Sequence, residues 1–317
     1  MNLQPSEDHR AFLDALGKVL AQTDIEIVDG QRSFFSARLD TALEDSGLFE
    51  AAGMDEFGPV AAAMLVEEVS RLPAIVELGA SSLVRPLVCP EWPRPLAIID
   101  GHIANPARFL CEARTVLFVG ETEIRLGALA EGDCVPAEVF FAYPMGRLKD
   151  PRAVFARSEP AGPSSEVRRR LAIATTCEIA GALQGALAAV SDHVTARRQF
   201  GRPLGSFQAV QHRLAKAATD IAASRLLALR AADLGGMDDA LMAMGFAQDC
   251  AVRIVYDLHQ FMGAMGLTLE HPLYRWTYRV KRLANEGGSS FRQFRDASGI
   301  LWGNAPEDFT GDRRMAR

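Results

Sequence analysis

Apolar side chains recur with the period of a helix through the first quarter of the chain. Such a stripe lies on one helix face and lets that face pack on a core. It is interrupted near Gly53 and again at Pro73, residues that interrupt or end helices. We therefore expect a series of helices between residues 7 and about 85. The residues that carry the stripe are Phe12, Leu16, Val19, Leu39, Leu43, Leu48, Met64, Leu65 and Val69.

The pattern changes at residues 85–95, where closely spaced prolines cannot continue a helix. Beyond them, short runs with strand-like composition are separated by turns that contain glycine or charged residues. These runs are residues 96–99, 115–119 and 139–142. They predict a small antiparallel β unit.

A proline, glycine and serine stretch at residues 159–166 ends the predicted β unit, and the remainder is helical. Gly181 and Gly185 interrupt the first long helix, where they would let a neighbouring helix approach closely. The expected helices cover residues 165–198, 206–233 and 238–262, with a cap at Asp238. Four antiparallel helices are the natural assembly of such segments.

The chain is thus predicted to be mainly α. Its 317 residues, 49% of them hydrophobic, suffice to bury a substantial core. We expect three parts: an N-terminal helical domain (1–88), a reduced central β domain (89–160) and a C-terminal helical bundle (161–317).

Charge and segment composition narrow the range of partners. The formal net charge is -6, so we expect no general attraction to nucleic acid or to anionic lipid. Glu7 and Asp8 stand where a secretory signal would carry basic residues, and we found no apolar run of the ~20 residues needed to cross a bilayer. The expectation is a soluble, cytoplasmic protein.

Cysteine and histidine spacing argues against a disulfide framework or a metal centre. The five cysteines show no CxxC spacing, and the six histidines show no HxxxH spacing. We expect reduced, structural cysteines and no metal.

Two segments carry a more specific pattern. The first, residues 197–212, contains Arg197, Phe200 and Gly201, followed by Phe207 and Gln208. It resembles the RxxFG and FQ signature of acyl-CoA dehydrogenases. The second, residues 260–272, begins at Gln260 and resembles the QxxGGxG segment of that family and the EHP-type stretch after it. The N-terminal helical region is also similar to that of the family.

The resemblance implies a role for these segments. In that family they hold the adenine and pyrophosphate half of FAD, whose flavin ring lies on the neighbouring subunit. Arg197 would then bind the pyrophosphate, Phe200 would stack on adenine, and Gln208 and Gln260 would bind ribose or phosphate oxygens. The other residues assigned to the cofactor are Gln199, Gly201, Phe261, Gly263 and, as a further candidate, Gly266.

Each residue also has a structural interpretation. An arginine at a helix end is commonly solvated and complements the helix dipole, and a single phenylalanine is commonly part of a core. Gly263 and Gly266 could equally be helix C-caps.

The sequence departs from the family in its middle region. A full-length member has a larger β domain, with a Trp-Ile-Thr-like strand around the flavin ring, and nothing comparable occurs between residues 95 and 160. The catalytic glutamate of the family is matched by Glu286, with a shifted register. Some members place this base at the position of Leu171, which cannot accept a proton. Glu178, further along that helix, is either a buried base or a partnered glutamate.

The resemblance therefore implies the short subunit of a heteromeric acyl-CoA dehydrogenase of the kind found in bacterial steroid degradation. Such a chain would complete the FAD site of a full-length partner in an α2β2 complex, act on an acyl-CoA, and pass electrons to an electron-transfer flavoprotein or a similar acceptor. Two alternatives stay open. In the first, the chain is a complete homo-oligomeric acyl-CoA dehydrogenase that uses Glu286, and in the second it is a flavin-free scaffold of the same fold.

Overall fold

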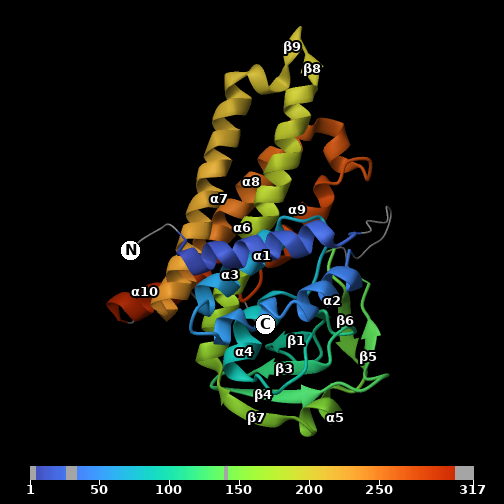
Figure 1. Cartoon of the computed structure of the whole chain (residues 1–317), viewed down its shortest axis with the longest axis vertical. Coiled ribbons are helices and arrows are strands. Elements are labelled where there is room, and N and C mark those ends of the chain that lie inside the picture. Colours follow the sequence, from blue (N-terminus) through green and yellow to red (C-terminus); the bar gives the residue numbers. More distant parts are fainter. Residues whose placement is uncertain (1–4, 26–33, 139–141, 304–317) are drawn as a thin grey trace, which may run out of the picture.

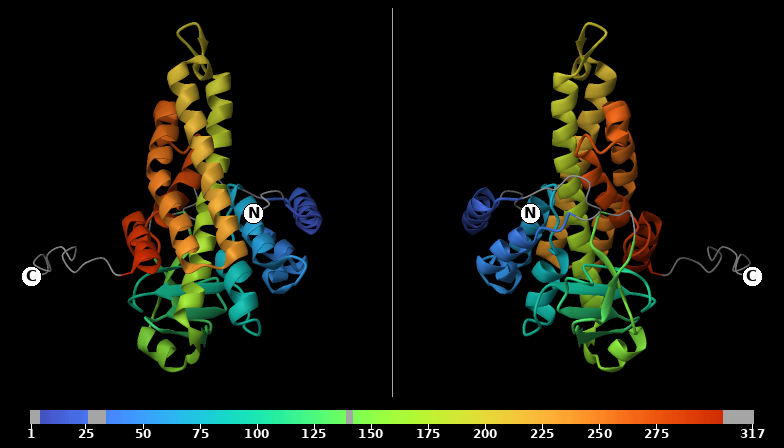
Figure 2. Two further views of the ribbon diagram at one scale, coloured as in Figure 1. Left: turned by 90° about the vertical axis from the view of Figure 1, so that its left-hand side faces the viewer. Right: turned by 90° about the vertical axis from the view of Figure 1, so that its right-hand side faces the viewer.

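A computed structural model of the chain describes residues 5–25, 34–138 and 142–303. The described part is elongated, with a bundle of long helices at one end and two small sheets at the other (Figure 1). Figure 2 shows α1 and α10 on opposite sides of this bundle. The fold is mainly α, as predicted.

The predicted N-terminal helices are confirmed. Ser6 and Ser36 accept hydrogen bonds from backbone amides of the first turns of α1 and α2, a standard N-cap. Helix α3 is buried on nearly all sides because it packs against η1 as well as against α6 and α7. The elements are α1 (Glu7–Gln22), α2 (Ala37–Asp45), η1 (Leu48–Gly53), α3 (Gly58–Ser70), η2 (Ala80–Val84) and α4 (Arg85–Val88).

The β region forms two sheets. The first has the strand order β1-β3-β4-β7 and consists of β1 (Leu96–Asp100), β3 (Thr115–Val119), β4 (Glu123–Ala128) and β7 (Glu159–Pro163). The second has the order β2-β6-β5 and consists of β2 (Ala107–Arg108), β6 (Met145–Leu148) and β5 (Cys134–Pro136). Helix α5 (Pro151–Ala156) precedes β7.

The prediction of a purely antiparallel unit was wrong. Strands β1 and β3 are parallel, with Leu96 opposite Thr115, whereas the other pairs are antiparallel. A parallel pair needs a long crossover connection, and here that connection contains β2. Of the strand predicted at residues 139–142, the first three lie outside the described residues, and Ala142 is not in a strand.

The predicted long helices are confirmed to within two residues at each end. They are α6 (Ser164–Ala196), α7 (Gln208–Leu234) and α8 (Met237–Met262), and they pack on one another. Two shorter helices complete the bundle, α9 (Leu273–Leu283) against α6 and α10 (Ser290–Trp302) against α8. The predicted cap at Asp238 is wrong, because α8 begins after Gly236 and has no side-chain cap.

The two glycines of α6 permit the close helix contact that their sequence positions predict. A Cβ at Gly181 would overlap the backbone carbonyl of Glu67, and one at Gly185 would overlap that of Arg71. The end of α3 therefore rests directly on the backbone of α6. The indole Nε1 of Trp276 donates to the same Arg71 carbonyl at 2.9 Å and fixes α9 there.

Helix α6 is long and apolar enough to cross a membrane by length and composition alone, contrary to the expectation that no such segment exists. Within this apolar window, 78% is buried inside the protein. Such burial is typical of the core helix of a bundle.

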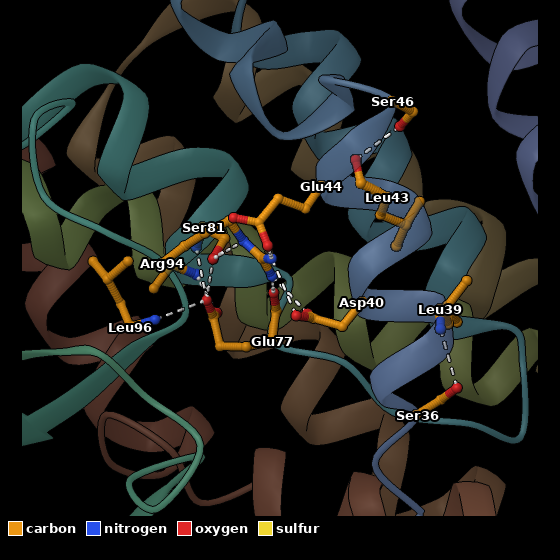
Figure 3. Close-up of polar contacts among 11 residues, drawn as sticks. Ser36, Leu39, Asp40, Leu43, Glu44, Ser46, Glu77, Ser81, Arg94 and Leu96 are labelled. Carbon is orange, nitrogen blue, oxygen red and sulfur yellow. Dashed lines mark hydrogen bonds and ion pairs between the residues drawn. The ribbon is translucent and has the colours of Figure 1, made fainter. Parts of the chain in front are cut away.

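Arg94 connects the N-terminal helices to the first sheet (Figure 3). Its guanidinium is 4% exposed and donates to Asp40 at 2.6 Å and to the Ser81 hydroxyl at 3.1 Å. The carboxylate of Glu77 accepts from the amides of Ala80, at 2.9 Å, and Leu96, at 3.4 Å. This network orients β1 against α2 and η2. The domain boundaries proposed from the sequence remain predictions.

Candidate functional site: the bundle tip and the central cavity

The first motif forms a hairpin at the far tip of the bundle (Figure 1). Helix α6 ends at Ala196, where the amide of Arg197 still donates to the carbonyl of His193 at 2.8 Å. The chain then turns through β8 (Arg198–Gln199) and β9 (Arg202–Pro203). The amide of Leu204 closes this loop on the carbonyl of Arg197 at 2.9 Å. The hairpin thus holds Arg197, Gln199, Phe200 and Gly201 in one exposed loop.

Phe200 is 86% exposed, so it is not a core residue. Its φ of +52° lies in the left-handed region, which is unfavourable for a bulky residue, and Gly201 follows with φ +81°. The ring packs edge-on against Phe207 with centroids 6.1 Å apart. A strained, exposed aromatic side chain suggests a binding role, because neither core packing nor local geometry accounts for it.

The second motif lies at the same end of the bundle. Gln208 starts α7 and Gln260 lies in the last turn of α8, and both are exposed. Between them, the guanidinium of Arg213 lies over the ring of Phe261 at 5.0 Å and pairs with Asp257. The structure thereby places the first turns of α7 against the last turns of α8.

The two glycines of the second motif have structural functions as well. Gly263 ends α8 with φ +61°, so the C-cap interpretation is confirmed for it. It is exposed, and no atom lies within 4 Å of the position of a Cβ. Gly266 is buried in η4 (Gly263–Leu267), where a Cβ would lie 2.8 Å from that of Met262. Open backbone suited to a close ligand is therefore present at Gly263 and absent at Gly266.

Charges at the tip are predominantly positive. Arg197, Arg198 and Arg202 are exposed, and Arg202 lies over the ring of Phe207 at 4.0 Å. His193 and His271 contact each other with ring centroids 6.2 Å apart. Burial, and then the charge of Arg197, lowers the pKa of His193, while burial and then His193 lower the pKa of His271. Lowered pKa values keep both imidazoles neutral near pH 7, so the arginines supply the charge.

The tip residues fit the adenine and pyrophosphate half of FAD. An arginine fork suits a pyrophosphate, an uncovered aromatic face suits a purine, and two amide side chains suit hydroxyl and phosphate oxygens. Gly263 lets the backbone approach without a side chain in the way. The assignment of the individual residues to the cofactor remains a prediction.

A second candidate site is a cavity of about 680 Å³ where the sheets meet the bundle. A volume of this order suits a small organic ligand. Its apolar wall includes Leu171, so this position, one of those at which the resemblance allows a base, lies in the cavity without a carboxylate. The apolar wall also includes Leu96, Ile98, Ala172, Leu241 and Met244, and the central polar residues of the cavity are Arg108, Glu178 and Glu286.

Glu286 lies in the connection between α9 and α10 and reaches this cavity. The amide of Gln248 holds the connection by donating to the Glu286 carbonyl at 2.9 Å. The carboxylate forms ion pairs with Arg108 Nε at 3.2 Å and with Arg282 at 3.7 Å. The position of Glu286 beside the cavity agrees with a base, whereas its two cationic neighbours do not.

Glu178 is buried and partnered. Arg108 donates to its two oxygens at 2.7 and 3.4 Å, and the Tyr143 hydroxyl donates at 3.0 Å. Burial, and then the Glu178 carboxylate, raises the pKa of Tyr143, so the phenol stays protonated as a donor. Of the two interpretations of Glu178, the structure supports the partnered glutamate. No sequence motif predicted Arg108, which lies in a two-residue strand, or Tyr143.

Sequence comparison matches residues 168–297 to the family described as acyl-CoA dehydrogenase, C-terminal domain. Isobutyryl-CoA dehydrogenase of Dictyostelium discoideum is 37% identical over 115 residues, which cover 34% of this chain and 27% of that protein. Acyl-CoA dehydrogenase IpdE2 of Mycobacterium tuberculosis is 30% identical over 146 residues, which cover 44% of this chain and 46% of that protein. The matched segments thus span less than half of either relative.

Structural comparison extends over nearly the whole chain. A chain of the ChsE4-ChsE5 complex from Mycobacterium tuberculosis matches with a TM-score of 0.76 and 18% identity, covering 96% of this chain and 100% of that chain. Butyryl-CoA dehydrogenase from Megasphaera elsdenii matches with a TM-score of 0.74 and 18% identity, covering 95% and 100%. The protein therefore has the acyl-CoA dehydrogenase fold, and residues 168–297 of its helical C-terminal part are similar to the C-terminal domain of acyl-CoA dehydrogenases.

Proposed function

We propose that this protein is a subunit of a flavin-dependent acyl-CoA dehydrogenase and supplies the adenine and pyrophosphate site for FAD bound to a full-length partner. The observation that carries the proposal is the bundle tip, where a strained and 86% exposed Phe200 stands among exposed arginine and glutamine side chains. The exposure of this ring is explained if a nucleotide bound to a second chain stacks on it.

Each tip residue has a role in this proposal. Arg197 neutralises the pyrophosphate, Phe200 stacks on adenine, and Gln208 and Gln260 bind ribose or phosphate oxygens. Gln199, Gly201, Phe261 and Gly263 shape the surface. FAD supplies the acceptor for the hydride that leaves the β-carbon of an acyl-CoA, while a carboxylate removes the α-proton.

The partner is proposed to be a full-length acyl-CoA dehydrogenase in a cytoplasmic α2β2 complex, with a steroid-derived acyl-CoA as substrate and an electron-transfer flavoprotein or a similar acceptor. Similarity to a chain of the two-component ChsE4-ChsE5 complex supports the heteromeric part. Similarity to a structure described as a steroid acyl-CoA dehydrogenase variant, with a TM-score of 0.66 and 19% identity, supports the substrate class.

A homo-oligomeric enzyme that uses Glu286 is the second candidate. The position of Glu286 in a cavity of about 680 Å³ favours it. The ion pairs of Glu286 with Arg108 and Arg282 count against it, because a general base must be free to approach its proton. A flavin-free scaffold would explain neither the exposure nor the strain of Phe200.

The test is flavin retention in a complex with the full-length acyl-CoA dehydrogenase encoded in the same gene neighbourhood. Arg197→Ala and Gln260→Ala should each raise the Kd for FAD about tenfold or more, since a charge-assisted hydrogen bond contributes about 1.5–3 kcal/mol. Arg230→Ala, at the other end of α7, and Gln22→Ala, at the end of α1, are the matched controls. Unchanged retention in both tip variants would remove the proposal.

A further inference from the structure

Arg108 stands between the two carboxylates of the cavity. Its Nη atoms donate to Glu178 at 2.7 and 3.4 Å, while its Nε faces Glu286 at 3.2 Å. Strand β2 positions Arg108, helix α6 positions Glu178, and the connection between α9 and α10 positions Glu286. One guanidinium thus joins three separate parts of the fold.

The cations and the phenol that contact this cluster complement its two carboxylates. Arg282 faces Glu286 at 3.7 Å, and the Tyr143 hydroxyl donates to Glu178. Burial alone would lower the pKa of Arg108, but the charges of Glu178 and Glu286 raise it well above its ordinary value. The buried guanidinium of Arg279 lies near Tyr143 and Glu178 and adds further positive potential. The guanidinium of Arg108 therefore stays charged near neutral pH.

The Oε2 atom of Glu286 is buried and accepts no hydrogen bond within the described residues, so its contacts are the two cations. To act as a base, the Glu286 carboxylate would have to give up its ion pairs with Arg108 and Arg282 in order to accept a proton. Separating a largely buried ion pair without a replacement partner is strongly unfavourable. Such a penalty adds to the activation barrier of any step that requires the separation and slows that step.

We propose that Arg108 is a positioning residue that withholds Glu286 from base catalysis, so that the cavity of this chain is silent and the dehydrogenation occurs in the partner's active site. The proposal rests on the proposed function, because it explains why a chain with a glutamate beside a cavity works through its bundle tip instead. The same ion pairs fix β2 to α6 and keep the cavity walls together.

The base step can be measured without flavin or partner. Phenylacetyl-CoA, a thioester whose α-proton is acidified by its aryl group, is incubated with the full chain in D₂O. If Glu286 acts, the α-C–H bond breaks, the proton moves to the carboxylate, and the electron pair delocalises into the thioester carbonyl. A deuteron from solvent then bonds to the α-carbon, so the probe gains mass without any redox change.

The variants separate the charge of Arg108 from the stability of the fold. In Arg108→Met with Glu178→Leu, the buried ion pair becomes an apolar pair, an exchange that is often neutral for stability. Adding Tyr143→Phe removes the hydroxyl that would lose its acceptor and provides a second variant should the first not fold. Arg108→Lys retains the charge and is the control, and Glu286→Gln added to each variant identifies the base.

The unmodified chain and Arg108→Lys should exchange at the rate of buffer. The variants without Arg108 should exchange about a hundredfold faster, the range expected of a positioned general base, and Glu286→Gln should abolish the gain. A change in folding alone would not produce a gain that depends on Glu286. Two results overturn the proposal: Glu286-dependent exchange by the unmodified chain, or folded variants without Arg108 that stay at the buffer rate. FAD retention by the complex is a separate measurement, so neither result would overturn the proposed FAD-binding role of the bundle tip.

Discussion

The backbone carbonyl of Glu67 lies against Gly181, with no space for a side chain between the two helices. Gly181→Ala should therefore lower the free energy of unfolding by about 1–3 kcal/mol, the usual range for overpacking a core. Gly17→Ala in α1 is the matched control, because no atom lies within 4 Å of its Cβ position, and it should stabilise by about 0.5–1 kcal/mol. Urea unfolding of both variants measures the difference. Equal effects would mean that α3 does not rest on α6 in solution.

Arg94 provides a second stability prediction. Arg94→Met removes the cation of the buried ion pair with Asp40 and leaves an unpaired buried carboxylate. The free energy of unfolding should therefore fall by about 3–5 kcal/mol. The exposed pair of Arg38 with Asp24 is the control, and Arg38→Met should cost less than about 1 kcal/mol. Thermal unfolding of the two variants compares them. A similar small loss in both would show that the network in Figure 3 contributes little.

Substitution of Phe200 should affect FAD binding without lowering stability. In Phe200→Gly the left-handed backbone is no longer strained, so the free energy of unfolding should stay the same or rise by about 1 kcal/mol. FAD retention by the complex should nevertheless fall, because the aromatic face for adenine is gone. Phe291→Ala is the control, since Phe291 is also exposed, at 74%, but lies on α10. If Phe200→Gly retained FAD fully, adenine would not stack there.

The histidine pair at the tip gives a pH dependence. The pKa values of His193 and His271 lie below the ordinary 6.5, so below that pH the unfolded chain binds more protons than the folded one. Their contribution to stability is therefore present above pH 6.5 and is lost as the pH falls through the folded pKa values. Replacing both by Gln should reduce the difference in unfolding free energy between pH 7.5 and 5.5. Urea unfolding at the two pH values measures this difference, and an undiminished difference in the double variant would contradict the prediction.

Much of the fold follows from local patterns. The three long helices are predicted by their composition and by the glycine and proline residues that separate them, and Gly181 and Gly185 mark positions at which the contact with α3 leaves no space for a side chain. The parallel pairing of β1 with β3 was missed because strand direction depends on a crossover that no short motif encodes.

Part of the candidate site could be predicted from the sequence, and part required the fold. The tip residues belong to contiguous motifs, so the sequence alone predicts them as cofactor-binding residues. Arg108 and Glu178 are 70 positions apart, and their ion pair exists because β2 and α6 meet in space. Leu171 and Glu286 were found by position along the chain, but the two cations beside Glu286 required the fold.

Flavin content is the most direct measurement of the central claim. The chain is expressed alone and together with the full-length acyl-CoA dehydrogenase of its gene neighbourhood, and the bound FAD per chain is determined by absorbance after purification. The account predicts a colourless protein alone and a yellow complex with fewer flavins than subunits, from which Arg197→Ala releases FAD. Stoichiometric FAD and turnover in the chain expressed alone would contradict it.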